Sequence, residues 1–245
     1  MRSGTRILWK RAACLLPRRG ERVTMKRHKG QMSESMLLGT LLTLAGGFQD
    51  AYSYNCRGHV FANAQTGNIV LLGQNLAGGQ WAAALHYLFP LLAFLAGVYA
   101  SEWVRHLGRR SRTLHWRQTV LLVEICLLAA AGFLPQAMNP LANVLMSFAC
   151  AMQVDSFRKF KGIPCATTMC IGNMRSGTEL LSRYHITKDK ALLRQSLHYY
   201  YIILVFAAGA ALGAVLTGLI GEKTIWIAAG LMAAGFALMF IREKA

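Results

Sequence analysis

Apolar residues in this chain fall in long continuous blocks rather than in the alternating pattern of half-buried strands. Several blocks approach the roughly 17 to 25 residues that a helix needs to cross a hydrocarbon core, and they contain few charges. These blocks are 37–54, 82–104, 119–134, 141–154, 199–220 and 224–241. Barrel strands are shorter and alternate in polarity, whereas 202–208 is apolar throughout. The pattern predicts an all-α, polytopic integral membrane protein with about six transmembrane helices.

Two further segments, 61–77 and 164–182, are interrupted by glycines and polar side chains. Irregular backbone at membrane depth survives only where protein or a water-lined cavity satisfies its hydrogen bonds. We therefore expect both segments to be re-entrant or broken helices that face the protein interior. The predicted substrate-binding residues lie in these segments or at the helix ends leading into them: Asp50, Asn63, Gln65, Thr66, Gly67, Asn68, Gln153, Asp155, Thr167, Thr168, Gly172, Asn173 and Arg175.

A weak internal repeat relates the two interrupted segments at an offset of 105 residues. Its matched pairs are Asp50 with Asp155, Tyr52 with Phe157, Gly67 with Gly172, Asn68 with Asn173 and Leu76 with Leu181. Chance also gives a few identities, but the same order of elements recurs in both halves. Small residues recur at four-residue spacing in the third element, which favours close helix packing: Ala93, Gly97 and Ser101, then Gly209, Gly213 and Thr217.

The repeat divides the membrane region into a first half, 35–134, and a second half, 135–245. Each half contains three predicted spanning helices, which is an odd number. The second half would then be inserted upside down relative to the first. The sequence thus predicts an inverted repeat, with one interrupted segment in each half.

Positive charge is distributed unevenly among the connections. Lys and Arg number 27 against 10 Asp and Glu, for a net charge of +17. Cytoplasmic loops of membrane proteins carry the excess of Lys and Arg. Twelve of these residues lie in 105–117, 158–163 and 183–195, against two in 55–60 and 221–223 and none in 78–81 or 135–140. This bias predicts a multi-pass protein of the inner (cytoplasmic) membrane with both termini in the cytoplasm.

The N-terminal tail, 1–34, is strongly basic, since ten Lys and Arg residues lie within 1–29. We interpret it as a disordered cytoplasmic extension that contacts anionic lipid, as the basic loops would also do. An RNA-binding arm is the weaker alternative, and translation could also start at Met25 or Met32. The remaining positive charges are scattered over short loops, so no nucleic-acid partner is expected.

Inverted repeats with interrupted helices are the architecture of many secondary transporters. Half-helix N-termini suit anions, and carboxylates at membrane depth suit cations or protons. Asp50 and Asp155 are the leading carboxylates, although each could instead cap a helix or pair with Arg57 or Arg158. Glu124 could couple to protons or pair within the bundle. Arg175 could bind an anion or pair with Asp155 or Glu179.

Other chemistry finds little support in the sequence. The cysteines form no CxxC pair, and the histidines lack metal-ligand spacing, so we expect no metal and no cofactor. A nucleophile and base pair is not recognisable, which argues against an enzyme. The leading hypothesis is a transporter or permease for a small organic solute or ion, and the alternative is a non-transporting membrane scaffold or sensor. A monomer and a homo-oligomer are both open.

Two motifs carry a family resemblance. GGFQDAYSY followed by HVFANAQTGNIVLLG, and MQVDSFRKFKGIPCATTMCIGNMRSGTELL in the second half, resemble the YoaK-like membrane proteins, a bacterial family of unknown function. Ile171 departs from the family, which often has Thr before Gly-Asn, as this chain does at Thr66. The resemblance implies a polytopic bacterial membrane protein and brings no substrate with it.

Overall fold

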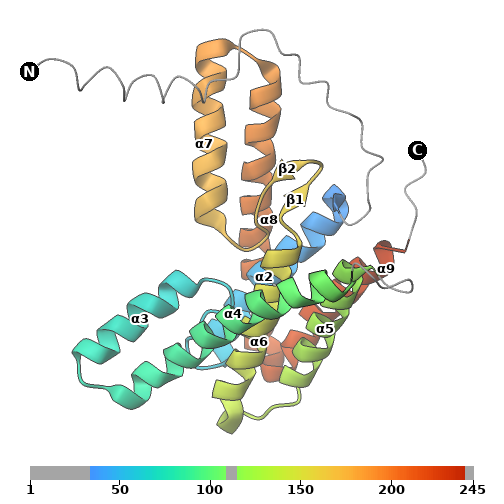
Figure 1. Cartoon of the computed structure of the whole chain (residues 1–245). Helices are drawn as coiled ribbons and strands as arrows, with labels where there is room; N and C mark the ends of the chain where they lie inside the picture. Colours follow the sequence, from blue (N-terminus) through green and yellow to red (C-terminus); the bar gives the residue numbers. More distant parts are fainter. Residues whose placement is uncertain (1–33, 109–114, 241–245) are drawn as a thin grey trace, which may run out of the picture.

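Helices account for most of the computed structural model, which describes residues 34–108 and 115–240. The α-helices are α2 (Met36–Cys56), α3 (Gln65–Ala77), α4 (Trp81–Gly108), α5 (Trp116–Ala131), α6 (Asn139–Ser156), α7 (Cys170–Thr187), α8 (Lys190–Ile220) and α9 (Ile225–Leu238). Short 3-10 turns lie at η3 (Gln136–Met138) and η4 (Gly221–Thr224), and a hairpin of β1 (Lys159–Phe160) and β2 (Ile163–Pro164) separates α6 from α7. The described chain is therefore almost entirely α-helical, as the apolar blocks predicted (Figure 1).

Each predicted spanning block is helical, but the ends differ from those expected. The connection predicted for 183–195 is helical on both sides of a short turn, and α8 begins at Lys190 instead of 199. Lys188 ends α7 in a left-handed conformation, and the carboxylate of Asp189 caps α8 by accepting the amide of Ala191 at 2.8 Å. Local capping thus lengthens the second interrupted segment into a complete helical hairpin.

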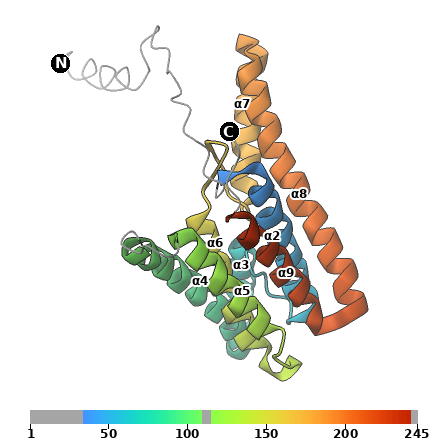
Figure 2. The same ribbon diagram turned by 90° about the vertical axis from the view of Figure 1, so that its right-hand side faces the viewer.

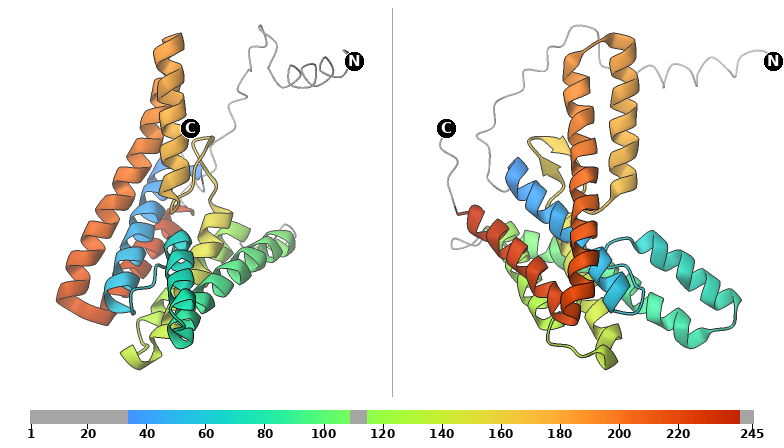
Figure 3. Two further views of the ribbon diagram at one scale, coloured as in Figure 1. Left: turned by 90° about the vertical axis from the view of Figure 1, so that its left-hand side faces the viewer. Right: turned by 180° about the vertical axis from the view of Figure 1, so that it is seen from behind.

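Helices of the two halves are interleaved. α2 packs along α8, and α6 packs along α4, while α5 contacts both α6 and α9. Both long pairs are parallel: Gly209 and Gly213 meet the backbone of Leu44 and Phe48 in α2, and Gly97 meets Phe148 in α6. Gly97 packs on Phe148 as Gly209 packs on Leu44. By these contacts Gly97 is equivalent to Gly209, whereas the sequence repeat matched it with Gly213, one helical turn away. Figures 2 and 3 show α8 lying along α2.

Two helical hairpins project from the interleaved centre. One hairpin consists of α7 and the first turns of α8, and it extends beyond the other helices. The other consists of α3 and the start of α4, and it extends away from the interleaved centre (Figures 1 and 3). Asn68 is the one buried residue of α3, so this helix contributes little to the core. The hairpins are held mainly by the helices they run into, α4 and α8.

Apolar surface faces outward on the longest helices. α4 and the continuous helical stretch of α8 and α9 are long and apolar enough to cross a membrane, and only 22% of the most apolar window of each is buried. A helix that is apolar on its exposed faces fits a lipid environment better than water. The tail 1–33, the middle of the 105–117 connection and residues 241–245 lie outside the described residues, as do the predictions that rest on them.

Candidate functional site

Asn68 and Asn173 have the same structural role in the two halves. The side-chain amide of Asn68 accepts from the backbone N–H of Phe61 at 3.0 Å and donates to its carbonyl at 2.8 Å. Asn173 forms the same pair of bonds with Ala166, at 3.3 and 2.7 Å. Each amide reaches from the first turn of a helix to the backbone seven positions earlier and satisfies groups there that no helix or strand pairs. We call these two loops the asparagine brackets.

The predicted site residues divide by burial. Thr66, Gly172 and Arg175 are exposed on the outer faces of α3 and α7, and Gln65 and Gly67 are half-buried. The polar density of the interrupted segments therefore does not all face inward, since helical periodicity turns part of each segment outward. The buried members are Asp50, Asn63, Asn68, Gln153, Asp155, Thr167, Thr168 and Asn173.

Both irregular segments reach the region where α2 and α6 lie. In the first segment, Asn63 donates from its backbone N–H to the Asp50 carboxylate at 2.6 Å and from its side chain to the Gly46 carbonyl at 3.1 Å. In the second, the Thr167 hydroxyl accepts from the Gln153 amide at 3.0 Å. The methyl group of Thr168 lies against Gly46, where a Cβ atom would be 2.7 Å away. Both segments thus contact α2 at Gly46.

A central polar cluster forms around these contacts, and we define it as Gln49, Asp50, Asn63, Glu124 and Cys150. The thiol of Cys150 donates to the Gln49 side-chain oxygen at 2.8 Å, and it lies within electrostatic range of Glu124 and Asp50. All five side chains are buried. Polar groups at this density in a protein interior are costly unless they bond to one another or to a ligand.

Several atoms of this cluster have no hydrogen-bond partner within the described part of the chain. They are the amide nitrogen of Gln49, the side-chain oxygen of Asn63 and both carboxyl oxygens of Glu124. Glu124 has no exposed surface at all. The cluster therefore has donors and acceptors available for a small solute, a water molecule or an ion.

Three members of the cluster are absent from the predicted site residues: Gln49, Glu124 and Cys150. Of the two alternatives for Glu124, pairing inside the bundle is not formed with any residue that the structure describes. Nothing in the sequence indicates the hydrogen bond from Cys150 to Gln49. The isolated acid within the apolar block 119–134 was the one available signal for Glu124.

Arg57 is the largest fully buried side chain of the molecule as described. Its guanidinium donates to the carbonyl of Ala131, the last residue of α5, at 3.0 Å and to that of Leu134, which follows α5, at 2.8 Å. It also donates to the Tyr52 hydroxyl at 2.9 Å and the Asn139 side chain at 3.1 Å. Neutral acceptors thus surround a charged group that the sequence placed in a connecting loop. The expected alternative, a pair with Asp50, is not formed.

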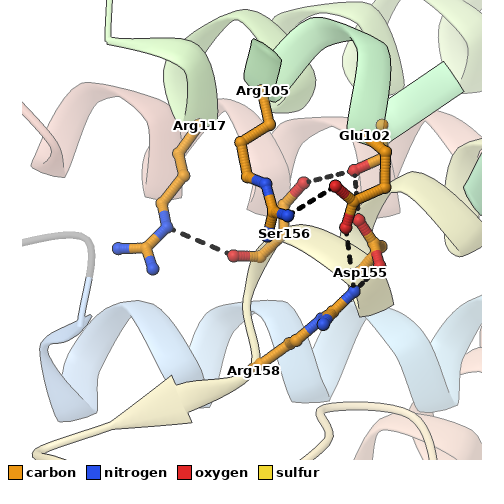
Figure 4. A network of polar contacts seen from close by, with 7 residues as sticks. Glu102, Arg105, Arg117, Asp155, Ser156 and Arg158 are labelled. Carbon is orange, nitrogen blue, oxygen red and sulfur yellow. Dashed lines mark hydrogen bonds and ion pairs between the residues drawn. The ribbon is translucent and has the colours of Figure 1, made fainter. Parts of the chain in front are cut away.

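Asp155 lies in a different setting, an ion-pair network at the end of α6 (Figure 4). Its carboxylate contacts the guanidinium of Arg158 and accepts from the Ser101 hydroxyl at 2.9 Å. Glu102 contacts Arg158 at 3.4 Å and Arg105 at 2.5 Å. The alternative in which Asp155 pairs with Arg158 is therefore the one the structure contains. Asp155 does not join the central polar cluster.

The same end of the molecule carries the cap of α5. His115 accepts the amide of Arg117 on its Nδ1 atom at 3.3 Å, and the Gln118 side chain completes a capping box. Burial, and secondarily the charge of Arg117, lower the pKa of His115 below its usual value. The neutral ring that can accept this bond is therefore favoured at physiological pH.

Metal and disulfide chemistry find no support in the described ranges. No group of three or more His, Cys, Asp and Glu residues there could hold a metal ion. Cys56, Cys126, Cys150, Cys165 and Cys170 are free thiols. Arg175 is exposed and forms no ion pair with Asp155 or Glu179. The central polar cluster is therefore the strongest candidate for a binding site.

Comparison with known proteins identifies relatives over the same helices. The family model described as "Protein of unknown function (DUF1275)" matches residues 38–238. The chain is 28% identical over 200 residues to "UPF0700 transmembrane protein YoaK" of Bacillus subtilis (strain 168), covering 77% of this chain and 86% of that protein. No solved structure matches the chain. The family match includes both asparagine brackets and the central polar cluster.

Proposed function

This chain belongs to the DUF1275 family and is a membrane protein, and we propose that it is a secondary transporter or permease for a small organic solute or ion. The observation that carries the proposal is the central polar cluster. It is buried among helices with apolar outer faces, and it retains unpaired donors and acceptors. Polar and ionisable groups at such a position are expensive, and in membrane proteins they mark substrate and ion pathways.

The proposal includes an inverted repeat, and the interleaved packing supports it. α2 of the first half lies parallel to α8 of the second, and α6 of the second lies parallel to α4 of the first. In Figure 1 α2 descends along the chain and α6 ascends, so these equivalent helices run in opposite directions. The two asparagine brackets are related by the same 105-residue offset and contain the same hydrogen bonds, which also supports the repeat.

Six membrane crossings with the two hairpins partly re-entrant would fit this repeat. The α2, α5 and α8 helices descend in Figures 1 and 2, whereas α4, α6 and α9 ascend. This alternation is the one that six successive crossings require. Under this reading the basic connections and both termini are cytoplasmic, as the distribution of Lys and Arg predicts.

Closure at both ends would be needed for alternating access. The buried Arg57 network lies at the end of α2, and the Asp155 network lies at the end of α6. Because these helices run in opposite directions (Figure 1), the two networks at their C-terminal ends lie at opposite ends of the interleaved helices. Each network joins helices from both halves of the repeat, so each is a candidate gate between the cluster and one side of the membrane.

Reconstitution into liposomes tests the proposal directly. Purified protein would be exposed to pooled metabolites under an imposed pH or Na⁺ gradient, and uptake would be measured by mass spectrometry of the vesicle contents. We expect accumulation of at least one solute, reduced in Asp50→Asn and Asn68→Ala. Gln74→Ala, at an exposed position of α3, is the matched control and keeps full uptake.

Absence of flux under both gradients, with protein of confirmed fold and insertion, would contradict transport. It would favour the scaffold or sensor alternative, in which the polar segments only satisfy one another. Flux that Asp50→Asn and Asn68→Ala leave unchanged would instead show that the central polar cluster is not the transport site.

A further inference from the structure

Glu124 occupies the least compensated position in the molecule as described. Its side chain lies in the third turn of α5 and has no exposed surface. Neither carboxyl oxygen receives a hydrogen bond from any residue that the structure describes. By contrast, Asp50 accepts a backbone amide and Asp155 contacts an arginine. Of the buried acids that the structure describes, Glu124 alone has neither a hydrogen bond nor an ion pair.

The helices packed against α5 explain this isolation. α9 contributes no titratable side chain, because its sequence is IWIAAGLMAAGFAL. α6 contributes the thiol of Cys150, whose own proton is donated to Gln49, and Asp50 of α2 completes the titratable groups of the cluster. α4 meets α5 near their connected ends, where Glu102 and Arg105 belong to the ion-pair network (Figure 4). Two arginines lie at the ends of α5, Arg117 in its first turn and Arg57 on the Ala131 carbonyl. Among the described residues, neither of them donates a hydrogen bond to Glu124.

In this environment the protonated and ionised forms of a carboxyl group differ greatly in free energy. The neutral acid needs no counter-charge, whereas the carboxylate needs a donor or a cation that the closed cluster does not supply. The one donor of the cluster without an acceptor is the side-chain amide nitrogen of Gln49. Movement of α2 against α5 and α6 would change how well that amide, or water, stabilises the carboxylate.

We propose that Glu124 is a hydrogen-ion binding site, protonated when the central polar cluster is closed and deprotonated when the cluster opens to one side of the membrane. The ligand of this site is the proton itself. Its use as the coupling ion rests on the proposed transport function, but the existence of the site does not. On release the carboxyl O–H bond breaks and the proton passes to water, leaving the carboxylate; on binding the reverse occurs, and no other covalent bond changes.

Infrared difference spectroscopy of lipid-reconstituted protein tests this assignment without any substrate. A protonated carboxylic acid has a C=O stretch that is separate from the carboxylate and amide bands. We expect this band in wild type at neutral pH, its decrease on alkaline titration, and its absence from Glu124→Gln. Glu102→Gln is the matched control, because Glu102 is ion-paired and half-exposed, and it keeps the band. The Asp50→Asn variant shows how much of the band comes from Asp50, the second acid of the cluster.

Spectra of wild type and Glu124→Gln that coincide at every pH would overturn the proposal. So would a Glu124 band that Na⁺ removes at constant pH, because the site would then take a metal cation instead of a proton. The glutamine variant has the same shape, and size-exclusion chromatography verifies its fold. A Glu124→Asp variant keeps a carboxylic acid at this position and, unlike Glu124→Gln, should keep the band.

The infrared experiment and the transport experiment can contradict their two proposals separately. The band without solute flux leaves the proton site standing and removes the transport function. Flux without the band leaves transport standing and removes the proton site. With both present, Glu124→Gln should abolish accumulation driven by the pH gradient while leaving counterflow of the solute.

Discussion

The ends of α2 and α6 occupy matching places in the two halves but use different chemistry. At the end of α2, Arg57 is fully buried and bonds to neutral backbone and side-chain acceptors. At the end of α6, Arg158 is half-exposed and joins Asp155 and Glu102 in ion pairs. The asparagine brackets next to them are the same in both halves. The repeat therefore preserves backbone architecture while the electrostatics of its two ends have diverged.

This difference indicates that the two ends separate with different ease. A buried guanidinium shared by several carbonyls must lose all its hydrogen bonds at once when the helices part. The half-exposed Arg158 side chain can exchange Glu102 and Asp155 for water at little cost, while the buried Asp155 carboxylate keeps its hydrogen bond to Ser101. If the molecule opens alternately to the two sides, the end that carries Asp155 should open more readily in the absence of ligand.

Arg57→Met should have the largest effect on stability. It leaves the carbonyls of Ala131 and Leu134 and the side chain of Asn139 without their donor, at about 1–3 kcal/mol for each buried group. We therefore expect a loss of about 3 kcal/mol or more, measured by unfolding in mixed micelles titrated with SDS. Arg57→Lys keeps the charge but not the planar fork, and it should be intermediate. A change below about 1 kcal/mol in Arg57→Met would show that these bonds add little.

Gly209→Ala tests the interleaving of the halves. A Cβ atom there would clash with the Leu44 carbonyl of α2, so α8 and α2 must separate. Overpacking of this kind costs about 1–3 kcal/mol. Gly218→Ala is the control in the same helix, because no atom lies within 4 Å of its Cβ position, and it should be neutral. Equal melting temperatures for the two variants would mean that α2 and α8 are not in close contact.

The two asparagine brackets should differ in strength. Asn68 is fully buried and also donates to Gln65 at 2.9 Å, whereas Asn173 makes only the two bonds to Ala166. We expect Asn68→Ala to cost about 2 kcal/mol and Asn173→Ala about 1 kcal/mol. Hydrogen–deuterium exchange should rise at the amides of Phe61 and Ala166 respectively. Exchange that rises in neither loop would remove the bracket role.

Arg158→Gln should have the smallest effect. Its side chain is 57% exposed, and the Asp155 carboxylate keeps its bond to Ser101. The exposed pair with Glu102 contributes about 0–1 kcal/mol, and added salt should reduce this contribution further. The pair with Asp155 is exposed on the Arg158 side only, so water can replace the guanidinium there. The same micelle titration, carried out at low and high ionic strength, measures both quantities. A loss as large as that of Arg57→Met would remove the contrast between the two ends.

Much of the fold could be predicted from the sequence, because a long apolar helix leaves a continuous apolar block in one stretch of the chain. Each apolar block is a helix, and the two Gly-Asn motifs both begin helices after irregular loops. The matched pair of Asn68 and Asn173 was found by offset alone and has matched hydrogen bonds. Helix ends were less accessible, since capping at Asp189 and the left-handed Lys188 extended helix into a predicted loop.

Long-range partners were decided only by the tertiary structure. Asp50 and Asp155 are equivalent in sequence, yet one accepts a backbone amide and the other contacts Arg158, because an ion pair depends on which neighbour reaches it. Sequence placed Arg57 in a loop, but packing buried it beneath α5. Composition and periodicity thus determined that the chain forms apolar helices with two polar interruptions. Packing of the two halves decided which polar groups are paired and left Glu124 without a hydrogen-bond partner among the described residues.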